Sequence, residues 1–280
     1  MGRAARGLSG VLATFALWLA NDAAAECPEL RSLLRATQAQ PSVSWVSQFV
    51  RMVIAASDDD GLLSTPEMER LYVAATDAYS PLELVKDIEQ SLGEPCNAEA
   101  TASANAFYRS PTGVKFIRGA LELLSESGGE REAAWFEKLR EEGVSSGRLE
   151  AVRSTRSASL VYDAPPRVRL ALVRPLALVT IRAVAREKGL PEPSQAEISD
   201  GIARDSSLRN AYFDLQSDLA LLFATRDLSL AELQEFRSFL GSSTGVWYRE
   251  STSRAFEGAV ERAGERFIAS AAPARAGSDP

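Results

Sequence analysis

The chain of 280 residues contains no histidine and only four lysines. Without histidine there is no imidazole for acid–base catalysis, no Ser-His-Asp or Cys-His nucleophile pair, and no histidine-ligated zinc. No lysine stands in a Ser-x-x-Lys pairing, and the sequence has neither a G-x-x-x-x-G-K-[S/T] phosphate loop nor a G-x-G-x-x-G motif. These absences disfavour catalysis without excluding it, because enzymes can work with carboxylates alone.

The sequence also lacks an apolar run of about 20 residues, the length that a membrane-spanning helix needs. The apolar stretch at 8–20 is shorter; it follows Arg3 and Arg6 and precedes the small residues at 23–25. This order predicts a signal peptide over residues 1–25 and therefore a periplasmic or secreted protein. An uncleaved N-terminal membrane anchor is the alternative.

Cysteine is scarce, with only Cys27 and Cys96. In an exported protein an even count predicts a disulfide, and a bridge closing this loop is worth about 4 kcal/mol on the chain-entropy model. Two free thiols are the alternative. A redox centre is disfavoured because there is no Cys-x-x-Cys spacing. A lipid anchor on Cys27 is also disfavoured, since Glu26 stands where a lipoprotein signal requires a small residue.

Excess positive charge is a further absence. Removal of the signal peptide removes Arg3, Arg6 and Asp22, which takes the formal net charge from −7 to −8. An acidic exported protein is a poor match for nucleic acid or for anionic lipid surfaces. The chain has no basic run with interleaved aromatic residues, so nucleic acid is excluded as an expected partner.

What the mature chain does contain is helical periodicity. Segments such as 43–56 and 81–92 place apolar residues at three- and four-residue spacings, and no segment alternates with a period of two. The apolar stretch at 170–184 contains Arg174 and Pro175, which favours a buried, kinked helix over a membrane span. The hydrophobic content of 45% is enough for a core, so the sequence predicts an all-α protein.

One ten-residue phrase occurs twice. Residues 107–116 read FYRSPTGVKF, and residues 239–248 read FLGSSTGVWY. A further aromatic match pairs Phe116 with Tyr248. The identical pairs are Phe107/Phe239, Ser110/Ser242, Thr112/Thr244, Gly113/Gly245 and Val114/Val246.

The similarity extends beyond the phrase at the same offset of 132 residues. Asn97 falls on Ser229, and both residue types favour helix N-caps. A helix-turn-helix unit of this kind cannot bury its apolar face alone, so we expect the two copies to pack together. The predicted fold is an all-α helical bundle or array built from two divergent repeats.

The proline pair at 165–166 marks the predicted boundary between the two copies. The expected organisation is a cleaved signal peptide at 1–25, an N-terminal unit at 26–164, and a C-terminal unit at 165–270. Residues 271–280 are rich in Ala, Pro, Gly and Ser and are predicted to be disordered.

The first phrase resembles the bacterial family catalogued as domain of unknown function 2059. The signature of that family looks like a helix with leucine and glutamate, followed by Phe-Tyr-x-Ser-Pro-x-Gly-x-x-Phe and then by an amphipathic helix. The second copy departs from it at Leu240 and Ser243, whereas residues 228–233 match the preceding helix better. Residues 148–158 also resemble the family's linker helix. The resemblance implies an exported, all-helical protein and implies no activity.

Physical chemistry gives the phrase a structural role. Phe107 and Phe116 can bury large rings where two helices meet. Ser110 can cap the second helix, and Pro111 suits its first turn. Gly113 allows close approach of the backbone. The same residues therefore predict a helix junction that the chain uses twice.

A binding groove at the phrase is the alternative. In the first copy its expected lining is Tyr108, Arg109 and Lys115. In the second copy its expected lining is Trp247, Tyr248 and Arg249. If only one copy retains a binding role, we expect the first, because it keeps the tyrosine and proline of the signature.

Residues 56–67 have the spacing of an EF-hand calcium loop, with Gly61 at the sharp turn and Leu63 at the hydrophobic position. Ala56 stands at the first ligand position, where Asp is expected, and this weakens the predicted binding. The alternative is an acidic turn in which Ser64 caps the next helix and Glu67 completes a capping box. The expected calcium ligands are Asp58, Asp60, Ser64 and Glu67, with the Leu62 carbonyl.

Three classes of function remain open. The first is a non-catalytic interaction or envelope-associated protein with a protein partner in the cell envelope. The second is a module that binds calcium or a small ligand. The third is a carboxylate-only hydrolase of cell-envelope glycans, which needs two carboxylates about 5–9.5 Å apart and for which the sequence selects no catalytic pair. The helical repeat and the absence of catalytic motifs favour the first.

Overall fold

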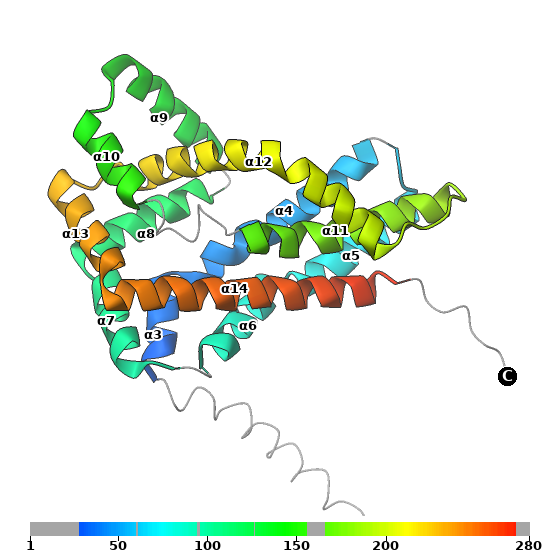
Figure 1. The fold of residues 1–280 in the computed structure, drawn as a ribbon, viewed down its shortest axis with the longest axis horizontal. Helices are drawn as coiled ribbons and strands as arrows, with labels where there is room; N and C mark the ends of the chain where they lie inside the picture. Colours follow the sequence, from blue (N-terminus) through cyan, green and yellow to red (C-terminus); the bar gives the residue numbers. More distant parts are fainter. Residues whose placement is uncertain (1–27, 60, 94–95, 126, 156–165, 273–280) are drawn as a thin grey trace, which may run out of the picture.

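The apolar spacing of the sequence produces helices throughout the described chain. The computed structural model describes residues 28–59, 61–93, 96–125, 127–155 and 166–272. Within these ranges the chain forms 12 helices, labelled α3 to α14, and no strand (Figure 1). The predicted all-α class is confirmed. The predicted signal peptide and nearly all of the predicted tail lie outside the described residues.

Of the helices in the described ranges, eight end before the proline pair at 165–166 and four begin at Pro166 or later. The first eight are α3 (Pro28–Ala36), α4 (Ala39–Asp59), α5 (Thr65–Ala78), α6 (Pro81–Gly93), α7 (Ala98–Tyr108), α8 (Pro111–Leu123), α9 (Gly128–Glu142) and α10 (Ser146–Thr155). The last four are α11 (Pro166–Glu187), α12 (Gln195–Ala224), α13 (Leu230–Gly241) and α14 (Ser243–Ser270).

Two features of this order differ from the sequence prediction. The apolar spacing at 194–204 and at 210–224 predicts two separate helices, and this prediction is wrong, because α12 runs unbroken through both ranges. No proline interrupts that stretch, and the Asp and Ser residues between the two segments are only moderately unfavourable in a helix. The sequence reading also missed α3, whose Leu30 and Leu33 are buried.

The two copies pack against each other in a reciprocal way. The approach helix of each phrase contacts the helix that follows the other phrase: α7 packs on α14, and α13 packs on α8. The preceding helices follow the same rule, since α6 packs along α14 and α12 packs along α8 (Figure 1). The short helices α3 and α10 cover α7 and α13, respectively. The expected packing of the two copies is therefore confirmed.

The same type of cap begins the approach helix of each copy. The Asn97 side chain accepts a hydrogen bond from the Ala100 backbone N–H at the start of α7. The Ser229 side chain accepts from the Glu232 backbone N–H at the start of α13, and the Glu232 carboxylate accepts from the Ser229 N–H. The two predicted N-caps are confirmed, and each satisfies a backbone donor that the helix itself leaves free.

The phrase itself has one geometry in both copies. Ser110 and Ser242 cap the following helices by accepting from Gly113 N at 3.2 Å and from Gly245 N at 3.1 Å. A Cβ atom at Gly113 would lie 2.6 Å from the Tyr108 Cα, and one at Gly245 would lie 2.7 Å from the Leu240 Cα. Both glycines are therefore needed for the close approach of two helix backbones.

Aromatic rings fill the space between the two phrases. Phe107 and Phe239, which are equivalent in the repeat, stack with ring centroids 3.8 Å apart and planes 4° from parallel. Phe116 packs on Phe236 at 4.4 Å, and Phe236 also stacks on Phe107 at 5.9 Å. The predicted burial of the ring is confirmed for Phe116, whereas Phe107 is only partly buried.

The apolar core forms two clusters, and each draws residues from both predicted units. The larger cluster joins α4, α5 and α6 to α11 and the C-terminal half of α14. The smaller cluster joins α7, α8 and α10 to the end of α12 and to α13. Packing therefore crosses the predicted boundary at 165–166, because each cluster combines residues of 26–164 with residues of 165–270.

Two further sequence predictions concern a membrane span and a disulfide. None of the described helices combines the length and the hydropathy needed to cross a membrane. Cys96 is half-buried and packs against the larger core cluster. Cys27 lies outside the described residues, so the Cys27–Cys96 disulfide stays a prediction.

Candidate functional site

The second half of the acidic loop has the backbone that the EF-hand spacing predicts. Gly61 has a positive φ of 60°, Leu63 is buried, and Ser64 is the N-cap residue of α5. The first half differs, because α4 stays helical to Asp59 and so includes Asp58 in its last turn. The side chain of Asp58 and the whole of Asp60 lie outside the described residues.

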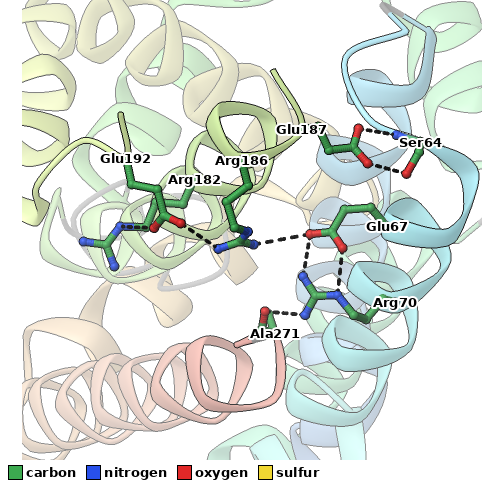
Figure 2. A network of polar contacts seen from close by, with 8 residues as sticks. All are labelled: Ser64, Glu67, Arg70, Arg182, Arg186, Glu187, Glu192 and Ala271. Atoms are coloured by element: carbon green, nitrogen blue, oxygen red, sulfur yellow. Dashed lines mark hydrogen bonds and ion pairs between the residues drawn. The ribbon is translucent and has the colours of Figure 1, made fainter. Parts of the chain in front are cut away.

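The capping box predicted for Ser64 and Glu67 is wrong. The Ser64 side chain makes no capping bond within α5. Instead the Ser64 backbone N–H donates to Glu187 Oε2 at 2.6 Å, and its hydroxyl donates to the other oxygen of the same carboxylate (Figure 2). Glu187, the last residue of α11, therefore takes the N-terminal position on α5 that a local capping partner would occupy.

Glu67 is held by two arginines. Arg70 donates from Nε to Oε2 at 2.9 Å and from Nη2 to Oε1 at 2.5 Å, and Arg186 Nη2 donates to Oε1 at 3.3 Å (Figure 2). The hydrogen bond from Arg70 is the main reason that the pKa of Glu67 is lowered; partial burial opposes it, and Arg186 adds to it. Glu67 is therefore a carboxylate kept ionised by its neighbours.

The network continues along the C-terminal end of α11. Glu192 accepts from Arg186 Nη1 at 3.3 Å and lies 3.9 Å from Arg182 Nε. Arg70 also donates to the Ala271 carbonyl at the end of α14 (Figure 2). We name this network the arginine–glutamate clamp, and its members are Ser64, Glu67, Arg70, Arg182, Arg186, Glu187 and Glu192.

The clamp limits what the loop can offer to a metal ion. Two guanidinium groups already neutralise Glu67, which is the expected bidentate calcium ligand. In the described part of the chain no three Asp, Glu or Cys side chains come together in a way that could hold a metal. With Asp58 and Asp60 beyond description, calcium binding at this loop stays a prediction.

The three predicted groove residues of the first phrase contact different partners. Tyr108 is buried and hydrogen-bonded to Tyr248, and burial raises the pKa of Tyr108 well above its usual value and that of Tyr248 to about 12. Lys115 pairs with Glu232 at 2.6 Å. Arg109 is exposed and donates to the Ser32 hydroxyl at 2.9 Å. These residues are not gathered around one groove.

The second-phrase alternative has a similar outcome. Tyr248 faces the buried Tyr108, with ring centroids 5.1 Å apart. Trp247 and Arg249 stand directly before and after Tyr248 on α14 and are half-buried. Tyr248 thus contributes to the junction between the copies.

Two further acid–arginine groups were missed by the sequence reading. Asp87 on α6 is buried and lies 3.2 Å from Arg262 Nε and 2.9 Å from Arg266 Nη1, both on α14. Glu122 on α8 pairs with Arg131 at 3.0 Å and also with Arg226. The i, i+4 spacing of Arg262 and Arg266 was the one local signal, since it places two cations on one face of a helix.

Comparison with known proteins adds no identity to this geometry. No protein-family model matches the chain, no curated protein is similar to it, and no solved structure matches its fold. The resemblance of the phrase to domain of unknown function 2059 therefore stays a prediction.

Proposed function

We propose that this chain is an exported, non-catalytic interaction protein associated with the cell envelope. The observation that carries the proposal is the use of both phrases as one junction, with equivalent rings stacked on each other. The most distinctive sequence in the chain is thereby assigned to holding two helical units together. That is what a scaffold for partner binding needs, because a rigid body positions its surface residues.

Two helix faces on this body are suited to a protein partner. The outer face of α5 exposes Tyr72 and Val73, with Glu69 and Asp77 beside them on the same helix. The outer face of α11 exposes Leu170 and Ile181 on either side of Arg174. Exposed apolar side chains with polar or charged residues around them are typical of a protein-binding surface.

Site-specific crosslinking in the producing cells tests this proposal. A photoreactive residue would replace Val73 or Ile181, and the matched control would carry it at the exposed Glu141 on α9. We expect a discrete adduct with the same envelope protein in independent preparations at Val73 or Ile181, and none at Glu141. Absence of adducts at both faces, or the same adducts at the control position, would contradict the proposal.

Export is tested separately, so that its failure does not decide the interaction. Cell fractionation and intact mass would be measured on the native chain. We expect the protein in the periplasm or medium, with Glu26 as its first residue. A chain that stays in the cytoplasm with residues 1–25 attached would overturn the export part alone.

Cation binding is the second candidate, favoured by the left-handed Gly61 and the N-cap position of Ser64 in the acidic loop. Calorimetry with millimolar calcium tests it, with Glu67→Gln as the matched control. Heat and a rise in Tm that the control abolishes would support the candidate. No heat and no thermal shift in the native chain would remove it.

A further inference from the structure

We propose that the arginine–glutamate clamp is a salt-sensitive gate between α5 and α11, which opens locally while the rest of the fold stays intact. These two helices pack chiefly on other helices and not on each other. α5 packs chiefly on α4 and α14, and α11 packs chiefly on α14, α12 and α4. Between α5 and α11 the link is made by clamp side chains, as Figure 2 shows for Glu67 with Arg186 and for Ser64 with Glu187.

Water and ions reach the charged side chains of the clamp. The side chain of Glu67 is 19% exposed and that of Arg186 is 30% exposed, while Glu192 is 41% exposed. Ion pairs at such positions are screened by dissolved salt in proportion to their exposure, whereas apolar contacts are not weakened by it. Salt therefore weakens the join between α5 and α11 selectively.

The clamp residues around Glu67 form one connected group. Glu67 holds Arg70 and Arg186 together, and Arg186 in turn holds Glu192. Loss of the Glu67 charge leaves both guanidinium groups without that partner. Because Arg70 also reaches the Ala271 carbonyl, the end of α14 is coupled to the same event.

Apolar residues lie directly behind the clamp on both helices. Leu63 and Met68 flank the clamp residues of α5, and Val179 and Ala183 lie one turn before those of α11. All four belong to the larger core cluster. Opening of the gate would therefore uncover one edge of this core.

The opposite side of α14 has a different kind of support. There Asp87 is buried and binds two arginines of α14, and α6 packs along that helix over much of its length. Arg262 and Arg266 are 39% and 34% exposed, much like the arginines of the clamp, so the difference lies in the packing of α6 along α14, which α5 and α11 do not share with each other. This contrast is why opening should stop at α5 and α11 and leave α6 closed.

Hydrogen exchange followed by mass spectrometry tests the gate on the full mature protein. The comparison is between about 0.05 and about 1 M salt, a range over which the screening length falls several-fold. We expect exchange at residues 61–71 and 180–192 to speed up about tenfold, with little change in α6 and in α13. Glu67→Gln should give the faster exchange at low salt, and added salt should then change little.

Two controls keep the outcome decisive. Glu142→Gln removes the exposed pair with Lys138 on α9 and should leave exchange at the gate unchanged. If Glu67→Gln fails to fold, Arg186→Gln, which removes the contact with Glu67 from the α11 side, and the salt series on the native protein carry the test. Exchange that is insensitive to salt at 61–71 and 180–192, or that rises equally in all helices, would overturn the proposal.

Discussion

The two copies of the phrase share one junction but continue differently. In the first copy α8 ends at Leu123, and α9 folds back to pack on α8 and α12. In the second copy α14 runs on through the equivalent positions and packs on α6, α11 and α5. The junction therefore fixes how the copies pair, whereas the residues that follow it decide which core each copy joins.

Side-chain size explains the different continuations. On α14 a buried stripe of small residues, Ala255, Ala259 and Ala263, lets neighbouring helices approach closely before Phe267 fills the core. At the repeat offset of 132, the first copy has Leu, Ser, Arg and Trp at these positions. Gly128 and Gly129 lie in the same stretch, and two adjacent glycines disfavour an unbroken helix.

The largest expected effect comes from filling the close approach in either copy. Gly113→Ala and Gly245→Ala should each lower the free energy of unfolding by about 3 kcal/mol, because the new Cβ meets backbone atoms that cannot move aside. Urea unfolding measures this. Gly241→Ala is the matched control, since nothing lies within 4 Å of its added Cβ. If only one of the two junction variants is destabilised, the copies are not equivalent.

A smaller effect separates the two continuations. Asp87→Asn in the α6–α14 contact should cost about 2 kcal/mol, because it leaves the partly exposed Arg262 and Arg266 without a charge partner. Glu122→Gln, in the more exposed pair beside α9, should cost about 1 kcal/mol. Thermal unfolding of both variants compares the two losses of stability. Equal losses would contradict the inference that the continuation of the second copy, α14, is held more firmly than that of the first copy, α9.

The smallest effect is a dependence on acid at the contact between α8 and α13. The hydrogen bond from Lys115, followed by that from the Ser229 N–H, lowers the pKa of Glu232 from 4.5 to about 2. A carboxyl with a lowered folded pKa contributes stability above its unfolded pKa and loses it as pH falls from about 4.5 towards about 2. Lys115→Met should therefore reduce the fall of Tm over this range. An unchanged pH profile would show that the pair contributes nothing measurable.

Local chemistry made the helix junction predictable from the sequence. Ser110 and Ser242 stand before helices whose first turns need a hydrogen-bond acceptor, and Gly113 recurs as Gly245. The repeat also predicted that equivalent faces would pack together, which Phe107 and Phe239 do. Each of these features depends on residues within a few positions of each other, or on the repeat itself.

The polar contacts were not predictable in the same way. Ser64 and Glu67 have the spacing of a capping box, yet Glu187 and Arg186 engage them from more than 100 residues away. Charge-assisted hydrogen bonds to a carboxylate or a guanidinium are stronger than the neutral local bond that they replace. Single-sequence patterns carry no information about which distant charge arrives at a helix end.

The account's central claim is that the two phrases form one junction in which equivalent residues face each other. A double-mutant cycle on Phe107 and Phe239 tests it most directly, with urea unfolding of Phe107→Leu, Phe239→Leu and the double variant. Because the rings stack at 3.8 Å, we predict a coupling free energy of about 1 kcal/mol. Strictly additive losses would contradict the claim, since they would mean that the two rings stabilise the fold independently.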